Sequence, residues 1–341
     1  MTTLTIRYEP CVVSFIDVLG FRSLLGTRSA ADIHGLLRQL EQFTRPDEEK
    51  PPRSMDEVRL RSRAFSFAIS DAIVRVRTYD TQYHNGAFFN ELYDLLHAQV
   101  GLIENGVIIR AGVAVGDAYV GYNGEGPLFG PALVRAYEIE SQEAIYPRIV
   151  VDEHAIAEHG RDPRLRGEHN TLEYERQAIE GLLATGEDGT RYIDYLRASR
   201  SEFEFVGGWL KFLNRHASLV RDGLAQSGNN RVACKFEWLA RYHDGCVAEL
   251  LEETTSSDAM ANELYEDGVK LDLASLISGL FVHTRQTMPC PRGGANLVRG
   301  GRCSWYPVRG NEDWRAAAAM VPPRLARTAP GTGVREGRGG L

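Results

Sequence analysis

The stretch that most constrains this chain runs from Cys11 to Phe21 (CVVSFIDVLGF). Its short apolar run is rich in β-branched residues and predicts a buried strand that carries Asp17, with a helical pattern beginning after Gly20. An unpaired Asp at the end of a buried strand is costly unless a cation or a hydrogen-bond donor satisfies it. The stretch therefore predicts either a bound cation or a polar partner at Asp17.

A second carboxylate is predicted at the tip of a hairpin. Residues 65–76 (FSFAISDAIVRV) contain two strands' worth of apolar sequence around Ser70 and Asp71. If this hairpin lies beside the first strand, Asp17 and Asp71 meet at one edge of a sheet, with no apparent cationic neighbour. Such a pair predicts a hard-cation site, for which Mg²⁺ with substrate phosphates fits best. The alternative is that Asp17 caps a helix and Asp71 only forms a turn.

Composition restricts the class of protein. Of the 341 residues, 43% are hydrophobic and 25% are charged, which is ordinary for a globular protein with one large or two modest domains. The net charge of −7 argues against a general nucleic-acid binder. The five cysteines form no zinc-type spacing, and no signal peptide or membrane-spanning run is found. These features predict reduced thiols and a cytoplasmic location.

The periodicity along the chain predicts an α+β fold. After the first strand, the expected strands lie at 58–70, 72–78, 107–116, 118–120 and 148–151. Helices are expected at 88–104 and 130–144, and residues 21–43 should form one interrupted helix or two short ones. Residues 118–120 are expected to pair back on the strand before them. The order β-α-ββ-α-ββ-α-β predicts a ferredoxin-like core with an added hairpin strand.

The later part of the chain has weaker patterns. Residues 152–189 are predicted to be polar and irregular, with His154 and His159 on the surface. The elements expected beyond them are a strand at 191–196 and helices at 202–224 and 229–251. From about Thr287 the chain is rich in Gly and Arg and should be disordered.

Four segments resemble motifs of the class III nucleotidyl cyclases. Residues 15–21 (FIDVLGF) resemble the family's first metal motif, and Ser70-Asp71 stands where the family has its second metal-binding Asp. Residues 110–116 (RAGVAVG) are similar to the central strand, and 129–140 (FGPALVRAYEIE) to the dimer-site helix. Within the family, segments 129–138, 146–150 and 237–243 are similar to the bacterial pyrimidine cyclases of the Pycsar antiphage systems.

The resemblance implies an enzyme that converts UTP or CTP to the 3′,5′-cyclic monophosphate and pyrophosphate. The product would be a second messenger in antiphage defence and would switch on a separate effector. The implied cofactor is Mg²⁺ or Mn²⁺, two divalent ions per site, and the implied assembly is a homodimer with shared sites. The expected division is a cyclase-like catalytic domain at 8–200, a helical extension at 201–256 and a poorly structured tail at 257–341.

The resemblance also implies roles for the residues of the first motif. The carboxylates of Asp17 and Asp71 and the backbone carbonyl of Val18 would hold the metal ions. Amides at the start of a helix suit phosphates. The candidate amides for the β- and γ-phosphates are those of Leu19, Gly20 and Phe21.

Departures from the family's pattern concern the base and the transition state. Purine-specific members carry a Lys four residues before the second metal Asp, and an acidic residue three before the Gly of the dimer-site helix. Here those positions are Phe67 and Pro127, which become the candidate base-pocket residues. Val134 and Glu138 stand where the family has Asn and Arg. Arg135, one turn before Glu138, is therefore the candidate catalytic cation.

Two alternatives stay open at this point. One is a purine cyclase, for ATP or GTP, that reads its base by other contacts. The other is a catalytically inactive homologue that binds a nucleotide and signals by conformation; the missing Asn and Arg favour it, and the two Asp residues oppose it. The choice between UTP and CTP is also open.

Overall fold

The structure is a computed structural model and describes residues 7–44, 59–121, 127–227, 230–256, 264–266 and 269–283. Its elements follow in the order β1 (Glu9–Val18), α1 (Phe21–Thr27), α2 (Ala30–Thr44), β2 (Ala64–Ile69), β3 (Ala72–Thr78), α4 (Ala87–Glu104), β4 (Ile109–Ala118), α5 (Pro131–Glu138), the π-helix η2 (Ile139–Glu143), β5 (Ile149–Val151), α6 (Glu153–Arg161), η3 (Pro163–Leu165), α7 (Leu172–Leu182), β6 (Leu183–Thr185), β7 (Arg191–Ile193), α8 (Tyr195–Ala198), η4 (Ser199–Glu202), α9 (Val206–Gln226), α10 (Asn230–Ser256), β8 (Leu264–Glu266), β9 (Val269–Leu271) and α11 (Leu273–Ser278).

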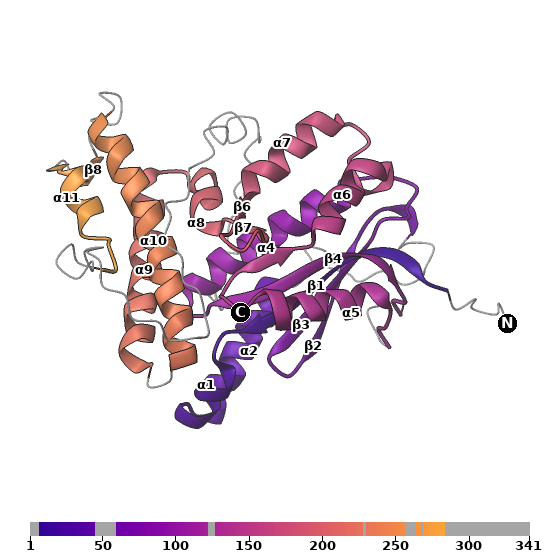
Figure 1. The fold of residues 1–341 in the computed structure, drawn as a ribbon, viewed down its shortest axis with the longest axis horizontal. Helices are drawn as coiled ribbons and strands as arrows, with labels where there is room; N and C mark the ends of the chain where they lie inside the picture. Colours follow the sequence, from indigo (N-terminus) through magenta and orange to yellow (C-terminus); the bar gives the residue numbers. More distant parts are fainter. Residues whose placement is uncertain are drawn as a thin grey trace, which may run out of the picture.

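One mixed sheet organises the fold, with seven strands in the order β2-β3-β1-β4-β5-β7-β6 (Figure 1). The first constrained stretch of the sequence becomes β1, which pairs antiparallel with β3 on one side and with β4 on the other. β4 pairs in parallel with β5. The predicted α+β fold class is therefore confirmed.

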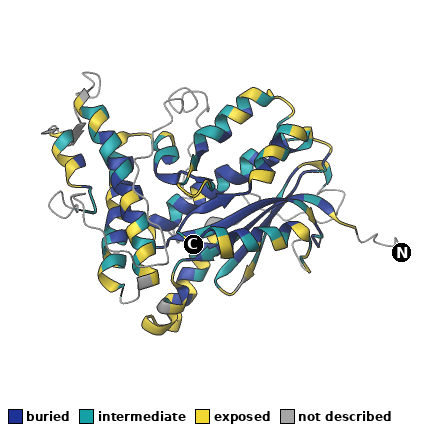
Figure 2. Cartoon of the chain, in the orientation of Figure 1, coloured by how far each residue is buried: buried dark blue, intermediate teal, exposed yellow. Residues whose placement is uncertain are grey.

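Helices cover both faces of this sheet (Figure 1). Because side chains alternate along a strand, Ser14 of β1 reaches α4 on one face, and Phe15 meets Tyr137 of α5 on the other. The strands form the most buried layer (Figure 2). Helices α9 and α10 pack together, and α9 contacts α4. Each face of β1 thus contacts a different helix. The charged side chains around β1 therefore form two separate clusters, one on each face of the sheet.

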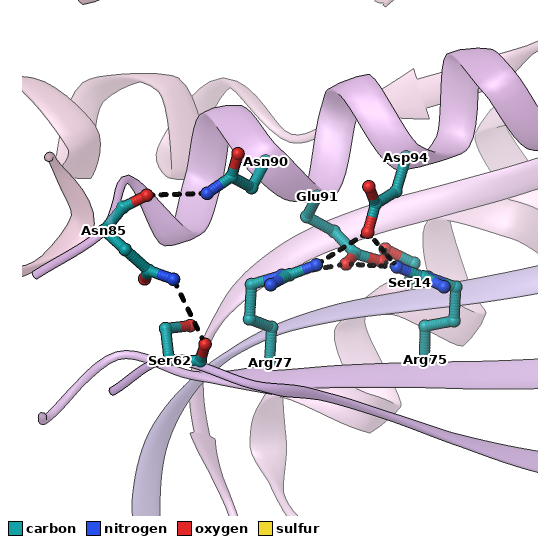
Figure 3. Close-up of polar contacts among 8 residues, drawn as sticks. All are labelled: Ser14, Ser62, Arg75, Arg77, Asn85, Asn90, Glu91 and Asp94. Atoms are coloured by element: carbon teal, nitrogen blue, oxygen red, sulfur yellow. Dashed lines mark hydrogen bonds and ion pairs between the residues drawn. The ribbon is translucent and has the colours of Figure 1, made fainter. Parts of the chain in front are cut away.

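A buried ion network joins the sheet to α4 (Figure 3). Arg75 of β3 donates two hydrogen bonds to Glu91, at 2.9 and 3.0 Å, and both Arg75 and Arg77 donate to Asp94 at 2.7 Å. The hydroxyl of Ser14 also donates to Glu91, at 2.9 Å. Arg75 is 1% exposed and Glu91 0%. Burial would raise the pKa of Glu91, but Arg75 and Arg77 outweigh it and lower this pKa to about 2.

Strand β4 begins and ends two residues later than the sequence predicts. It pairs with β1 as far as Glu9↔Ala118, so the ladder continues past Gly116. The predicted return strand at 118–120 is therefore wrong. Tyr119 instead forms an isolated bridge with Phe129, just before α5.

The segment 152–189, predicted to be irregular, contains helices α6 and α7. Side-chain oxygens of Asp152 and Thr171 cap the N-termini of the two helices. These capping residues favour helices even though the segment as a whole is polar. The prediction that His159 lies on the surface is also wrong. It is 3% exposed and bonds to Glu175 at 2.9 Å.

Part of the predicted tail region is described. Elements β8, β9 and α11 lie between Leu264 and Ser278, and the description ends at His283. The Gly- and Arg-rich tail from Thr287 lies outside the described residues. Among the helices that are described, none is long and apolar enough to cross a membrane.

Removal of the Glu91 charge should destabilise the fold strongly. Glu91→Gln leaves the buried Arg75 and Arg77 to share the single carboxylate of Asp94. The free energy of unfolding should therefore fall, by up to about 3–5 kcal/mol in urea denaturation. Because the folded-state pKa of Glu91 is lowered, its contribution is present above about pH 4.5 and is lost as the pH falls towards 2. Wild type should therefore lose stability more steeply than Glu91→Gln over that range.

Glu104→Gln, at an exposed position at the end of the same helix, is the matched control and should change stability by no more than about 0.5 kcal/mol. Equal effects of the two substitutions would contradict the role given to the network.

Candidate functional site

The hairpin brings Asp71 beside Asp17. In the β1–β3 register Asp17 lies opposite Ala72, and Asp71 immediately precedes Ala72 in the two-residue turn between β2 and β3. Ser70, the first turn residue, has a φ of 59°, which is uncommon for a residue other than Gly. The two carboxyl groups interact with each other. The structure therefore brings the two predicted metal ligands together.

Asp17 has a cationic partner that the sequence did not reveal. Arg110 lies directly opposite on β4, and its Nε and Nη2 atoms donate to Asp17 Oδ2 at 3.0 and 2.9 Å. Its Nη2 atom also pairs with Glu140 Oε1 at 2.6 Å. The expectation that Asp17 has no cationic neighbour is wrong, because the antiparallel register sets this contact across the sheet.

Glu140 reaches the cluster from the π-helix η2 and is 3% exposed. Burial raises the pKa of Glu140 to about 7; Arg110 opposes the rise and Asp17 adds to it. The backbone of the helix lies very close to β4 at Gly112. A Cβ atom there would lie 2.3 Å from the carbonyl oxygen of Ala136 and 2.7 Å from the amide of Glu140. The missing side chain at Gly112 is what allows Glu140 to sit at this depth.

A second cation faces the cluster from the C-terminal helices. Lys235 of α10 is half-buried, and its ammonium group interacts electrostatically with Arg110, Asp17 and Glu140. Burial lowers the pKa of Lys235, and Arg110 lowers it further. The sequence predicts the helix at 229–251 and offers no sign that Lys235 approaches Asp17. The only hint at Arg110 was its place at the start of the 110–116 motif.

The donor set suits a particular kind of metal site. Within the described ranges, no three His, Cys, Asp or Glu side chains gather as a ligand set. Mg²⁺ is usually held by one or two carboxylates together with water and substrate phosphates. Burial raises the pKa of Asp17, Arg110 opposes the rise and Asp71 adds to it. A divalent cation between the two carboxylates would relieve their repulsion, so Asp17 and Asp71 fit such an ion.

The residues that follow Asp17 differ in how well they suit their predicted roles. Val18 is buried at the same strand end, opposite Ile109. The amide of Leu19 donates to the carbonyl of Ile108 at 2.9 Å, so this amide is not available to a phosphate, and that part of the expectation is corrected. Gly20 and Phe21 begin α1 without a side-chain cap, and their phosphate role stays a prediction.

Arg135 does not join the carboxylate cluster within one chain. Its guanidinium donates to Asp152 at 2.9 and 3.2 Å and pairs with Glu143 at 2.8 Å. No hydrogen bond or ion pair links it to Asp17 or Asp71 in the residues that the structure describes. A catalytic role for Arg135 would therefore have to be exerted on another copy of the site.

The two candidate base-pocket residues also lie apart. Phe67 is opposite Val74 in the hairpin, and the pairing register puts it on the same face as Asp17. Pro127 is exposed and lies two residues before Phe129, which forms a bridge with Tyr119. Tyr119 follows the last residue of β4, whereas Arg110 lies at the start of that strand. Like Arg135, Pro127 could act only from a second protomer.

Neither a family model nor a curated protein matches this chain. Among solved structures, it is similar to the monomeric guanylyl cyclase domain of the RhoGC fusion protein from the aquatic fungus Blastocladiella emersonii. The identity is 16%, the match covers 55% of this chain and 95% of that one, and the TM-score is 0.33. The chain is also similar to the catalytic core of a rhodopsin-guanylyl cyclase with converted specificity, in complex with ATPαS. There the identity is 16%, the match covers 55% of this chain and 96% of that one, and the TM-score is 0.33.

A bacterial light-regulated adenylyl cyclase is 12% identical, with 44% of each chain covered and a TM-score of 0.28. At these TM-scores the similarity carries no argument about function.

Gly112→Ala should disturb both the fold and the site. The added Cβ atom forces α5 and η2 away from β4, which should lower the free energy of unfolding by about 1–3 kcal/mol in urea denaturation. Gly35→Ala, in α2 with nothing within 4 Å of the new atom, is the matched control. It should be neutral or stabilising by up to about 1 kcal/mol. Equal stability of the two variants would show that the close approach at Gly112 is unimportant.

Proposed function

We propose that this protein is a nucleotidyl cyclase that converts a nucleoside triphosphate to the 3′,5′-cyclic monophosphate and pyrophosphate. The observation that supports this most is the meeting of Asp17, near the end of β1, with Asp71, in the turn just before β3. Two carboxylates with no third protein ligand in the described chain leave room for phosphate oxygens on a divalent ion. Two Mg²⁺ or Mn²⁺ ions, when bound, would acidify the ribose 3′-hydroxyl and stabilise the leaving pyrophosphate.

The residues of the chain would mainly position these groups. Asp17 and Asp71 would hold the ions, with the carbonyl of Val18 as a further oxygen ligand. Arg110 orients Asp17 by donating both of its hydrogen bonds to the same oxygen, Oδ2. Its pairing with Glu140 offsets part of the negative charge of the cluster. Cyclisation within one nucleotide depends on such positioning, because the attacking hydroxyl and the phosphate already belong to one molecule.

For the substrate we propose UTP or CTP. Phe67 and Pro127 occupy the positions at which purine-specific cyclases carry polar groups that read the base. The register adds support for Phe67, since its side chain is on the same sheet face as Asp17 and Ala72. By the same resemblance, the cyclic nucleotide would activate a separate effector in antiphage defence.

We also propose a homodimer with two shared sites. The surface of α5 supports it, because Val134 is 56% exposed and Tyr137 52%, and the exposed rings of Phe129 and Tyr8 contact each other nearby. An exposed apolar patch of this kind marks an interaction surface. A second copy covering α5 would bring Arg135 and Pro127 to the partner's carboxylates, which they do not reach within one chain.

The direct test is incubation of the full chain with each of the four ribonucleoside triphosphates, with Mg²⁺ or Mn²⁺, and identification of the products. Cyclic UMP or cyclic CMP is expected. Cyclic AMP or cyclic GMP as the main product would replace the pyrimidine assignment, and no cyclic product from any of the four would contradict the proposed activity.

Asp17→Asn and Asp71→Asn should each reduce cyclisation to background while the protein stays folded. Each substitution removes a charged metal ligand without changing the shape of the side chain. Turnover is measured as product formation, and the fold by circular dichroism. Asp117→Asn, exposed on β4 far from the cluster, is the matched control and should retain normal turnover. Near-normal turnover of either cluster variant would mean that the metal assignment is wrong.

Arg135→Ala should lower turnover more than it weakens nucleotide binding, since a cation that acts on developing charge behaves in this way. Mixing Arg135→Ala with Asp71→Asn protomers should restore activity, because one of the two shared sites then has all of its groups. With subunit exchange verified, a mixture that stays inactive would argue against sharing.

Phe67→Ala should relax base selection. If the ring fills the space of a purine's second ring, its removal lets ATP or GTP compete with UTP and CTP, with a gain of no more than about 1–3 kcal/mol. The specificity constants for all four triphosphates give the measurement. Unchanged ratios in a folded, active variant would place base selection elsewhere.

A further inference from the structure

Lys235 is a half-buried cation beside a group of carboxylates. Arg110 is already engaged by Asp17 and Glu140. In contrast, no hydrogen bond or ion pair joins Lys235 to another residue in the part of the chain that is described. Its ammonium group is half-buried and interacts electrostatically with the same two carboxylates. Among the described residues, all three of its N–H donors are therefore left for a ligand that arrives at the cluster.

A stacked aromatic contact holds the neighbouring turn of α10 next to the chain that follows η2. One helical turn further along α10, Trp238 stacks on Tyr146 with ring centroids 5.4 Å apart and planes 9° apart. Tyr146 follows η2, the element that carries Glu140. Trp238 also meets Tyr192 of β7 edge-on, with centroids 5.8 Å apart. Because residues three apart on a helix lie on one face, this contact turns Lys235 towards η2 and the carboxylates.

An ammonium group at this place suits a polyphosphate. It is a compact charge with three donors, and it matches the oxygens of a phosphate. The carboxylates beside it are those that would hold the metal ions of the substrate's phosphates. A phosphate bound through those metal ions would thus lie within reach of Lys235.

We propose that Lys235 binds the triphosphate of the nucleotide, in the same protomer that supplies Asp17 and Asp71. This inference rests on the proposed cyclase function and adds a substrate-binding residue from α10, outside the predicted catalytic domain at 8–200. The helical extension is then part of the substrate site.

The test uses the full chain and inorganic tripolyphosphate, which has the charge of a triphosphate without ribose or base. In Lys235→Met, the inhibition constant of tripolyphosphate and the KM of the nucleotide should both rise about 10- to 100-fold, as expected for one lost hydrogen bond to a charged group. Lys235→Arg should recover most of the loss. Lys211→Met removes an exposed Lys of α9 and should match wild type.

The outcomes are distinguishable. An unchanged inhibition constant in a folded, active Lys235→Met enzyme overturns the assignment. An unchanged inhibition constant with altered ratios among UTP, CTP, ATP and GTP overturns it too, and assigns Lys235 to the base. If wild type makes no cyclic nucleotide and binds no tripolyphosphate, the proposed function fails together with this inference, whereas an active wild type isolates the role of Lys235.

Placement in the same protomer has a separate test at substrate concentrations below KM. A mixture of Lys235→Met and Asp71→Asn protomers should stay poorly active, because each shared site then lacks either Lys235 or Asp71. The mixture of Arg135→Ala and Asp71→Asn protomers is the positive control. Recovery of activity in the Lys235→Met mixture to the level of that control would assign Lys235 to the partner's site and overturn the proposal.

Discussion

The antiparallel register of β1 against its two neighbours determines where the charged side chains on either face of the sheet centre meet. Asp17 is opposite Ala72 on one side and Arg110 on the other. Because side chains alternate along a strand, a slip of one residue would turn Asp17 towards α4 and Ser14 towards α5. The hydrogen bond from Ser14 to the buried Glu91 opposes such a slip. The network on one face of the sheet thus holds the register on which the site on the other face depends.

The charged cluster on one face of the sheet is structural, and the cluster on the other face is suited to bind ligands. In the network beneath α4, two arginines and two carboxylates meet, and Arg75 and Glu91 are almost fully buried and bonded to each other. In the Asp17 cluster, Arg110 pairs with Asp17 and Glu140, and Asp71 interacts with Asp17, while Lys235 has no bonded partner within the described ranges. The first group is electrostatically complete, and the second is suited to receive a cation and an anion.

Helix α5 and its π-helical continuation connect the fold to the site. Gly112 lets the helix lie almost on the backbone of β4, and η2 turns Glu140 into the cluster. The same helix also exposes Val134 and part of Tyr137, which a second copy could cover. One short element therefore contacts the sheet, the carboxylate cluster and the candidate dimer surface.

The sequence by itself determined the α+β class, the strand that carries Asp17, the hairpin that carries Asp71 and the helices at 88–104 and 229–251. These features depend on local periodicity and turn residues, which neighbouring positions in the chain specify. Only the tertiary structure decided that Arg110 pairs with Asp17, that the Leu19 amide is already bonded and that Lys235 faces the cluster. Those contacts join residues far apart in the chain, and they depend on strand register and on how helices pack against the sheet, neither of which a single stretch of sequence encodes.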